Sequence, residues 1–157
     1  MGRGTVPRTG DVIEIATSGG YAYALYSHRN SEYGCLLRVW NDRHAQPLRD
    51  FGFMSVAAPS FSTFYSLGPS VRHALTTIVG NIPVPASLSE FPLFRAGGIP
   101  DPQTGKVDNW WLWDGEKEWR VGEITAEQRQ LPIRGVVNHA ALVGYIERAW
   151  TPPDDPR

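Results

Sequence analysis

Short runs of β-branched and aromatic residues, separated by glycine-containing turns, most constrain how this chain folds. Residues 11–17 read DVIEIAT, in which β-branched and polar residues alternate, and residues 21–26 read YAYALY after a Ser-Gly-Gly turn. Two such runs around a glycine turn predict a β-hairpin. A third apolar run, YGCLLRVW, follows at residues 33–40 and ends at a polar turn. The chain therefore begins with a predicted three-stranded antiparallel meander.

The second of these strands has one bulky face and one small face. Side chains alternate between the two sides of a strand, so Tyr21, Tyr23 and Leu25 point to one side. Ala22 and Ala24 point to the other side, where a second layer can approach closely. A curved sheet or a small barrel requires a face of this kind.

The middle of the chain mixes helix and strand signals. Pro69 is compatible with the first turn of a short helix. The β-branched run at residues 76–79, which Gly80 stops, predicts a strand after that helical turn. Residues 91–94 predict a further strand, and Pro92 favours a place at a sheet edge because proline cannot donate a ladder hydrogen bond.

A tryptophan-rich hairpin is the clearest local signal. The pair Asp114-Gly115 separates VDNWWLW from EKEWRV, and Asp-Gly is typical of a two-residue type I′ turn. This turn predicts the cross-strand pairs Trp113 with Glu116, Trp111 with Glu118, and Trp110 with Trp119. The predicted core face carries Trp110, Leu112, Trp119 and Val121. The opposite face carries Trp111, Trp113, Glu116, Glu118 and Arg120.

Two helical signals follow the hairpin. The sequence Thr125-Ala-Glu-Gln128 matches a capping box for one or two helical turns. Asn138 is a typical N-cap for a last helix that reaches Trp150, with an apolar stripe formed by Leu142, Tyr145, Ile146, Ala149 and Trp150. Together these elements predict an α+β, mainly β fold: a curved antiparallel sheet or SH3-like partial barrel with the C-terminal helix packed on it.

The length of 157 residues predicts one domain spanning residues 1–157. We expect a flexible lead at 1–9, a folded core at 10–150 and a solvated tail at 151–157, because TPPDDPR is proline-rich and charged. The 16 glycines and 13 prolines indicate many turns, without reaching the fraction typical of disordered chains.

Charge and cysteine content narrow the function classes. The formal net charge is −1, which argues against a protein that neutralises many nucleic-acid phosphates through one strongly basic face. Cys35 is the only cysteine, so it has no partner for an intramolecular disulfide. No secretory pattern follows the first basic residues, and the longest uncharged run, 51–71, is broken by proline and glycine. We expect a cytoplasmic protein without a membrane span.

Motifs for catalysis, metals and cofactors are largely missing from the sequence. The histidines, His28, His44, His73 and His139, are scattered singly, without the spacing of a metal site. No glycine-rich nucleotide loop occurs. Ser70 lies in Gly-Pro-Ser-Val-Arg, which lacks the final glycine of a hydrolase nucleophile elbow. We therefore expect no enzyme activity, no metal and no cofactor.

The second hairpin face is the candidate partner-binding surface. Trp111 and Trp113 lie beside Glu116, Glu118 and Arg120, and exposed aromatics anchor many interfaces. The acidic residues would suit a basic ligand. In the alternative, the C-terminal helix covers these tryptophans and Trp110 is the exposed one, because helices commonly bury an aromatic sheet face.

Three segments resemble the Immunity protein 26 family of bacterial polymorphic-toxin systems. Gly10-Asp-Val-Ile-Glu-Ile15 is similar to its first strand, and Gly20-Tyr-Ala-Tyr-Ala24 to its second. Residues 78–85, IVGNIPVP, resemble its later strand that runs into a G-x-x-P turn. This resemblance implies a small cytoplasmic protein that neutralises a cognate toxin effector domain by direct binding. The alternatives are a carbohydrate- or nucleic-acid-binding β module that uses exposed tryptophans, and a small hydrolase that uses Ser70.

Overall fold

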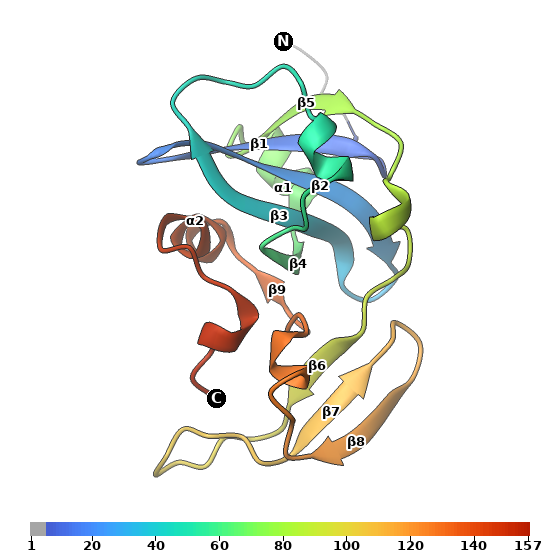
Figure 1. Cartoon of the computed structure of the whole chain (residues 1–157), viewed down its shortest axis with the longest axis vertical. Coiled ribbons are helices and arrows are strands. Elements are labelled where there is room, and N and C mark those ends of the chain that lie inside the picture. The colour runs from blue at the N-terminus through green and yellow to red at the C-terminus, as the bar shows by residue number, and fades with distance from the viewer. Residues whose placement is uncertain (1–5) are drawn as a thin grey trace. The chain divides into compact units, whose positions relative to one another are not determined.

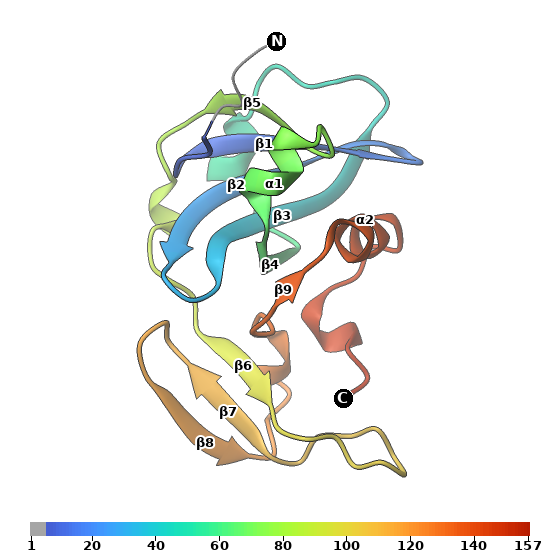
Figure 2. The same ribbon diagram turned by 180° about the vertical axis from the view of Figure 1, so that it is seen from behind.

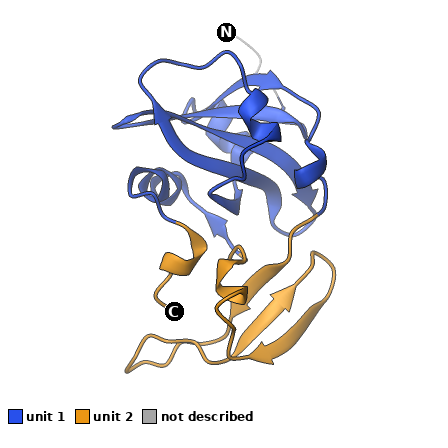
Figure 3. Ribbon diagram, in the orientation of Figure 1, with its two compact units in different colours: residues 1–90, 135–150 blue, residues 91–134, 151–157 orange. Residues whose placement is uncertain are grey.

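The chain forms two compact units in the computed structural model, which describes residues 6–157. Unit 1 combines the chain up to Glu90 with Gly135–Trp150, and unit 2 combines Phe91–Arg134 with Thr151–Arg157 (Figure 3). A single domain is predicted above, whereas the contacts within the chain separate after Glu90 and again at Gly135. Residues 1–5 of the predicted lead lie outside the described residues.

The fold is mainly β, with 36% strand and 18% helix, and it is not a closed barrel. Unit 1 contains a six-stranded sheet in the order β5-β1-β2-β3-β4-β9 (Figure 1). Its strands are β1 (Asp11–Thr17), β2 (Gly20–Asn30), β3 (Gly34–His44), β4 (Phe61–Tyr65), β5 (Thr77–Asn81) and β9 (Val136–Val137). The predicted meander is confirmed as β1, β2 and β3, whose pairs are antiparallel.

Irregularities in strand pairing bend this sheet. The register shifts between Val12 and Ile13 in β1, and twice in β2, near Tyr21 and near Tyr26. Such bulges bend a strand and increase its twist. One strand pair departs from the expected antiparallel arrangement: β9 runs parallel to β4, so the sheet is mixed.

Three short helical elements lie between β3 and the end of unit 1's first segment. The 3-10 helix η1 (Gly52–Ser55) and the helix α1 (Leu67–Arg72) precede β5, and the 3-10 helix η2 (Ala86–Leu88) follows it. The predicted helical turn at Pro69 and the strand after it are confirmed as α1 and β5. The chain leaves α1 through Ala74, whose φ of 58° is in the left-handed region.

The two faces of β2 are packed as the alternation of its side chains predicts. Its bulky face contributes Tyr23 and Leu25 to a cluster that also contains Val12, Trp40, Met54 and Leu88. Ala22 and Ala24 on the other face are fully buried. The C-terminal helix α2 (His139–Glu147) contacts β1 and β3, which flank β2, and both views place it beside β3 (Figures 1 and 2). Small residues on β2 thus leave room for a helical layer.

Helix α2 begins where its cap predicts and ends earlier than expected. The side chain of Asn138 accepts a hydrogen bond from the backbone N–H of Ala141 at 2.8 Å, which confirms the N-cap. The helix ends at Glu147, and Ala149 follows with a φ of 53°. Trp150 therefore lies beyond the helix, where its ring stacks on Tyr145 with a centroid distance of 4.2 Å.

Unit 2 contains a three-stranded antiparallel sheet in the order β6-β7-β8. Its elements are β6 (Phe94–Gly97), β7 (Trp110–Trp113), β8 (Glu118–Gly122) and the 3-10 helices η3 (Gln128–Gln130) and η4 (Pro152–Asp154). The strand predicted at residues 91–94 instead begins at Phe94. The predicted capping box is confirmed, because Thr125 and Gln128 exchange backbone-to-side-chain hydrogen bonds of 3.0 and 3.1 Å.

The segment 151–157, predicted as a solvated tail, is partly packed. Pro152 is buried, and its carbonyl accepts a 2.7 Å hydrogen bond from Arg95, while Pro153, Asp154 and Pro156 are exposed. The Thr151 and Asp154 side chains form a capping box around η4. The segment contains three prolines, which reduce the conformational entropy that it loses when it becomes ordered. The backbone carbonyls of Pro152, Pro156 and Arg157 each accept a hydrogen bond from an arginine or lysine side chain.

Candidate functional site

The tryptophan hairpin of unit 2 forms with a longer turn than the sequence predicts. Trp113 pairs with Glu118 and Trp111 pairs with Arg120, so the register of these two residues is displaced by two, and a further shift between Trp110 and Trp111 pairs Trp110 with Gly122. The Asp114 carboxylate causes this displacement, because it accepts hydrogen bonds from the backbone N–H groups of Glu116 at 2.9 Å and Lys117 at 2.8 Å. A displacement of two residues keeps every side chain on its face. Trp111, Trp113, Glu118 and Arg120 therefore still share one face.

The predicted exposure of Trp113 is wrong. Only 5% of this residue is exposed, and its ring lies 5.3 Å from Phe94 and 5.5 Å from Phe91 between centroids. The Arg134 guanidinium lies 5.5 Å from the centre of the same ring. Phe94 is directly opposite Trp113 on β6. Trp113 is thus part of the core of unit 2, whereas Trp111 is half-buried.

The tryptophan exposed on this hairpin is Trp119, which the sequence assigns to the core. It lies on β8, an edge strand of the sheet, and 41% of it is exposed. Trp110 is fully buried, as predicted, and its indole N–H donates to the Val107 carbonyl at 2.9 Å. The alternative with an exposed Trp110 is therefore also wrong. Within the described part of the chain, β8 has a neighbouring strand on one side only. The alternation of side chains within one hairpin does not show which of its strands lies at the edge of the sheet.

The charged residues of the hairpin differ in their contacts. Glu118 accepts a 2.7 Å hydrogen bond from Arg134, and Arg120 donates to the side chain of Asn109. Glu116 is exposed beside Asp114 at the tip. Hydrogen bonds from the backbone N–H groups of Lys117 and Glu116 lower the pKa of Asp114. The tip therefore carries a stable negative charge next to the exposed strand.

A hollow of 260 Å³ lies at the tip and is lined by Phe91, Asp114, Gly115 and Glu116. Gly115 has a φ of 102°, and a Cβ atom there would lie 2.8 Å from the Phe91 ring. Any other residue at this position would therefore strain the turn and displace Phe91. We name the exposed residues Glu116, Glu118, Trp119 and Arg120 the β8 surface, in which Trp119 points to the face of the strand opposite Glu118 and Arg120.

Ser70 does not form a hydrolase site with a histidine. Its hydroxyl oxygen lies 2.7 Å from the Tyr65 hydroxyl and 2.7 Å from the Thr76 hydroxyl. His139 reaches only Tyr65, with its Nδ1 atom 2.8 Å from the Tyr65 oxygen. Ser70 and Thr76 are both buried, which closes the serine to a substrate. This network joins β4, α1 and α2 inside unit 1.

The described histidine, cysteine and acidic side chains do not form a metal-binding cluster. Within residues 6–157, no group of three or more His, Cys, Asp or Glu side chains is arranged to hold a metal ion. Cys35 is buried and unpaired in β3, consistent with its predicted place in an apolar strand. Among the described helices, none combines the length and apolar character needed to cross a membrane.

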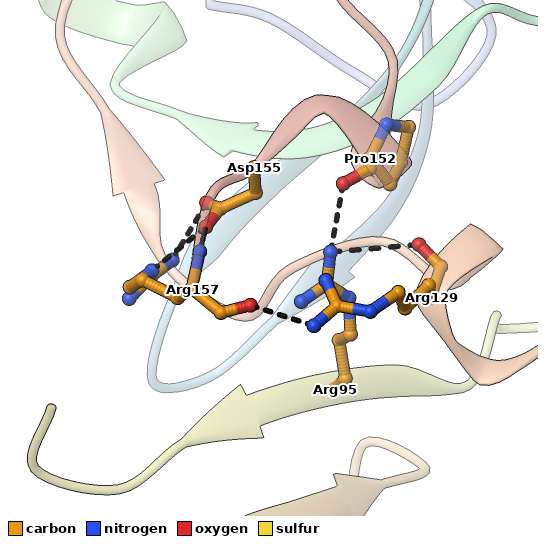
Figure 4. A network of polar contacts seen from close by, with 5 residues as sticks. All are labelled: Arg95, Arg129, Pro152, Asp155 and Arg157. Atoms are coloured by element: carbon orange, nitrogen blue, oxygen red, sulfur yellow. Dashed lines mark hydrogen bonds and ion pairs between the residues drawn. The ribbon is translucent and has the colours of Figure 1, made fainter. Parts of the chain in front are cut away.

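Two fully or nearly fully buried arginines were not anticipated from the sequence. Arg95 of unit 2 donates to the carbonyl oxygens of Pro152 and Arg129, at 2.7 and 3.4 Å (Figure 4). Its guanidinium lies 4.7 Å from the centre of the Trp110 ring, while Nε and Nη1 have no hydrogen-bond partner among the described residues. Burial lowers the pKa of Arg95 to about 10, so it stays charged near neutral pH.

Arg38, in β3 of unit 1, is better partnered. Its Nε donates to Ser27 at 2.9 Å, and Nη2 donates to the carbonyls of Leu88 and Glu90 at 3.3 and 3.0 Å. Nη1 also lies 3.4 Å from the Ser62 hydroxyl. The guanidinium thus fastens the segment at residues 88–90 to the sheet. An arginine in the middle of a predicted strand gave no sign of this role.

His28 extends the same network and predicts a pH dependence. Its Nε2 lies 2.8 Å from the Ser89 carbonyl and its Nδ1 lies 2.9 Å from the Ser27 hydroxyl. A carbonyl can only accept, so Nε2 carries the proton, and Nδ1 of the neutral ring accepts from Ser27. Burial, together with the positive charge of Arg38, lowers the pKa of His28 below its ordinary value of 6.5.

Lowering the pH below 6.5 is therefore expected to destabilise the protein. At pH values between the folded and unfolded pKa values of His28, the unfolded chain binds more protons than the folded chain. The free energy of unfolding therefore decreases as the pH is lowered through this range. The lowered pKa of His139 acts in the same direction. Urea unfolding at pH 7, 6 and 5 measures the effect. The variant His28→Gln should give a shallower dependence, and an unchanged slope would contradict the assignment.

Comparisons with protein-family models, with characterised proteins and with solved structures give no match to this chain. The resemblance to the Immunity protein 26 family therefore stays a prediction from the three quoted segments.

Proposed function

We propose that this chain is a non-catalytic immunity protein that neutralises a cognate bacterial toxin by direct binding. The observation that carries the proposal is the exposed edge strand β8, which presents Trp119 on one face and Glu118 and Arg120 on the other. Tryptophan and arginine are enriched among residues that dominate binding energy. An uncovered strand edge also offers backbone groups to a partner strand.

Charge suggests which partner surface would bind there. Asp114 and Glu116 place negative charge at the end of β8, and Glu118 remains 48% exposed although it pairs with Arg134. A basic region on the toxin would associate faster with this surface than a neutral one. Such a role places the protein in the cytoplasm of the toxin-producing cell. The buried position of Ser70 supports binding over hydrolysis.

Co-purification with the toxin encoded by a neighbouring gene tests the proposal. Trp119→Ala is expected to weaken toxin binding by about tenfold or more, because a central exposed aromatic is a typical hot spot. Leu75→Ala in unit 1 is the matched control, since Leu75 is an exposed apolar residue outside the β8 surface. Calorimetric titration measures both. Absence of binding by the unmodified protein would refute the proposal, and equal weakening by both variants would refute the β8 surface.

The exposed Trp119 also favours a second candidate function, a module that binds carbohydrate or single-stranded nucleic acid. Aromatic side chains stack on nucleic-acid bases. Titration with an oligosaccharide and with a short single-stranded DNA distinguishes this function from toxin binding. Saturable binding that Trp119→Ala abolishes would favour it.

A further inference from the structure

A pocket of 400 Å³ in unit 1 is lined in part by Arg38. The exposed residues Ser55 and Ser87 also line it, and apolar residues that include Ala58 and Leu88 complete the lining. One wall is formed by the end of η1 and the segment after it, and the other by η2. The lining thus combines an arginine, two serines and an apolar collar.

Hydrogen bonds hold both walls of this pocket. The indole N–H of Trp40 donates to the Ala57 carbonyl at 3.0 Å, and the N–H of Ser60 donates to the Val39 carbonyl at 2.7 Å. On the other side, Leu88 donates to the Pro85 carbonyl at 2.9 Å. The pocket is therefore formed before any ligand binds, which lowers the entropic cost of binding.

Arg38 brings an uncompensated positive charge to this pocket. Only 6% of the residue is exposed, and no described carboxylate lies within 4.0 Å of its guanidinium. Its acceptors are two serine hydroxyls and two backbone carbonyls, all neutral. These use four of the five N–H groups that a guanidinium carries. One N–H of Nη1 is left, and the other makes the longest contact, 3.4 Å to Ser62.

We propose that this pocket binds a small organic carboxylate. The Arg38 guanidinium supplies the charged contact, because a charge-assisted hydrogen bond is stronger than a neutral one. Ser55 and Ser87 are lining residues whose hydroxyl groups can donate further hydrogen bonds. The collar around Ala58 and Leu88 suits a short alkyl body, which distinguishes an organic carboxylate from inorganic phosphate. The pocket lies in unit 1 and does not depend on the β8 surface.

NMR titration of the full chain tests the proposal through the Arg38 Nε–H resonance. The probes are sodium propionate, inorganic phosphate and sodium chloride at equal ionic strength. Propionate is expected to give a saturable shift with a dissociation constant of about 1–10 mM. Phosphate is expected to bind more weakly, and chloride to give no saturation.

Two variants make the test specific without removing Arg38, whose hydrogen bonds stabilise the fold. Ala58→Leu fills the pocket and is expected to weaken propionate binding by about tenfold or more. Arg49→Gln removes an exposed positive charge outside the pocket and should leave the binding unchanged. The proposal is overturned by a non-saturating propionate response, by tighter binding of phosphate than of propionate, or by an unchanged affinity in Ala58→Leu.

Discussion

Replacing Trp113 with alanine is expected to lower the free energy of unfolding by about 3–5 kcal/mol, the range typical of truncating a buried tryptophan. Trp113 lies against Phe91 and Phe94 and beneath the Arg134 guanidinium. Its removal leaves a cavity between β6 and β7 that neighbouring strands can fill only in part. Loss of the Arg134 contact adds to the same effect.

The matched variant Trp119→Ala is expected to cost less than about 1 kcal/mol, because surface substitutions outside structural features usually have small effects. Trp119 is exposed on an edge strand of the same hairpin. Urea unfolding followed by circular dichroism measures both variants. Equal losses would mean that the two tryptophans are packed alike. A larger loss for Trp119→Ala would restore the core face predicted from the sequence.

Local sequence signals were sufficient where neighbouring residues alone determine the structure. The strands around Tyr21–Tyr26, the capping box at Thr125 and the N-cap at Asn138 all form as predicted. The grouping of Trp111 and Trp113 with Glu118 is also confirmed, because alternation along a strand does not depend on the turn. These features are encoded within a few residues of one another.

The exposure of the hairpin residues depended on contacts that no local pattern contains. Trp113 is buried because Phe94, which is distant in sequence, pairs with it on β6. Trp119 is exposed on β8, which has a neighbouring strand on one side only among the described residues. The hairpin register changed because the Asp114 side chain competed with a two-residue turn. The sequence therefore groups these hairpin residues on one face correctly but does not predict which tryptophan is exposed.

The two buried arginines predict different responses to the same substitution. Arg38→Met is expected to lower the free energy of unfolding by about 2–4 kcal/mol, because it leaves the carbonyls of Leu88 and Glu90 and the Ser27 hydroxyl without their donors. A buried polar group without a partner costs about 1–3 kcal/mol. Both carbonyls belong to the segment that Arg38 fastens to the sheet, so relaxation toward solvent offsets part of this cost.

Arg95→Met is expected to change the free energy of unfolding by less than about 1 kcal/mol. The variant loses the bond to the Pro152 carbonyl and the contact with Trp110. It also removes the two guanidinium nitrogens that have no partner among the described residues, and relief of their desolvation offsets the loss. Both variants remove one buried charge, so the difference between them reports the hydrogen bonds together with the contact of Arg95 with Trp110 and its electrostatic attraction to Asp155.

Urea unfolding of Arg38→Met and Arg95→Met, side by side, measures that difference. Arg49→Met is the control for loss of a positive charge at an exposed site, and its effect should be small. A greater loss for Arg95→Met than for Arg38→Met would mean that the partnerless nitrogens of Arg95 are satisfied in solution, by ordered water for instance. In that case Arg95, rather than Arg38, would be the principal polar anchor of this chain.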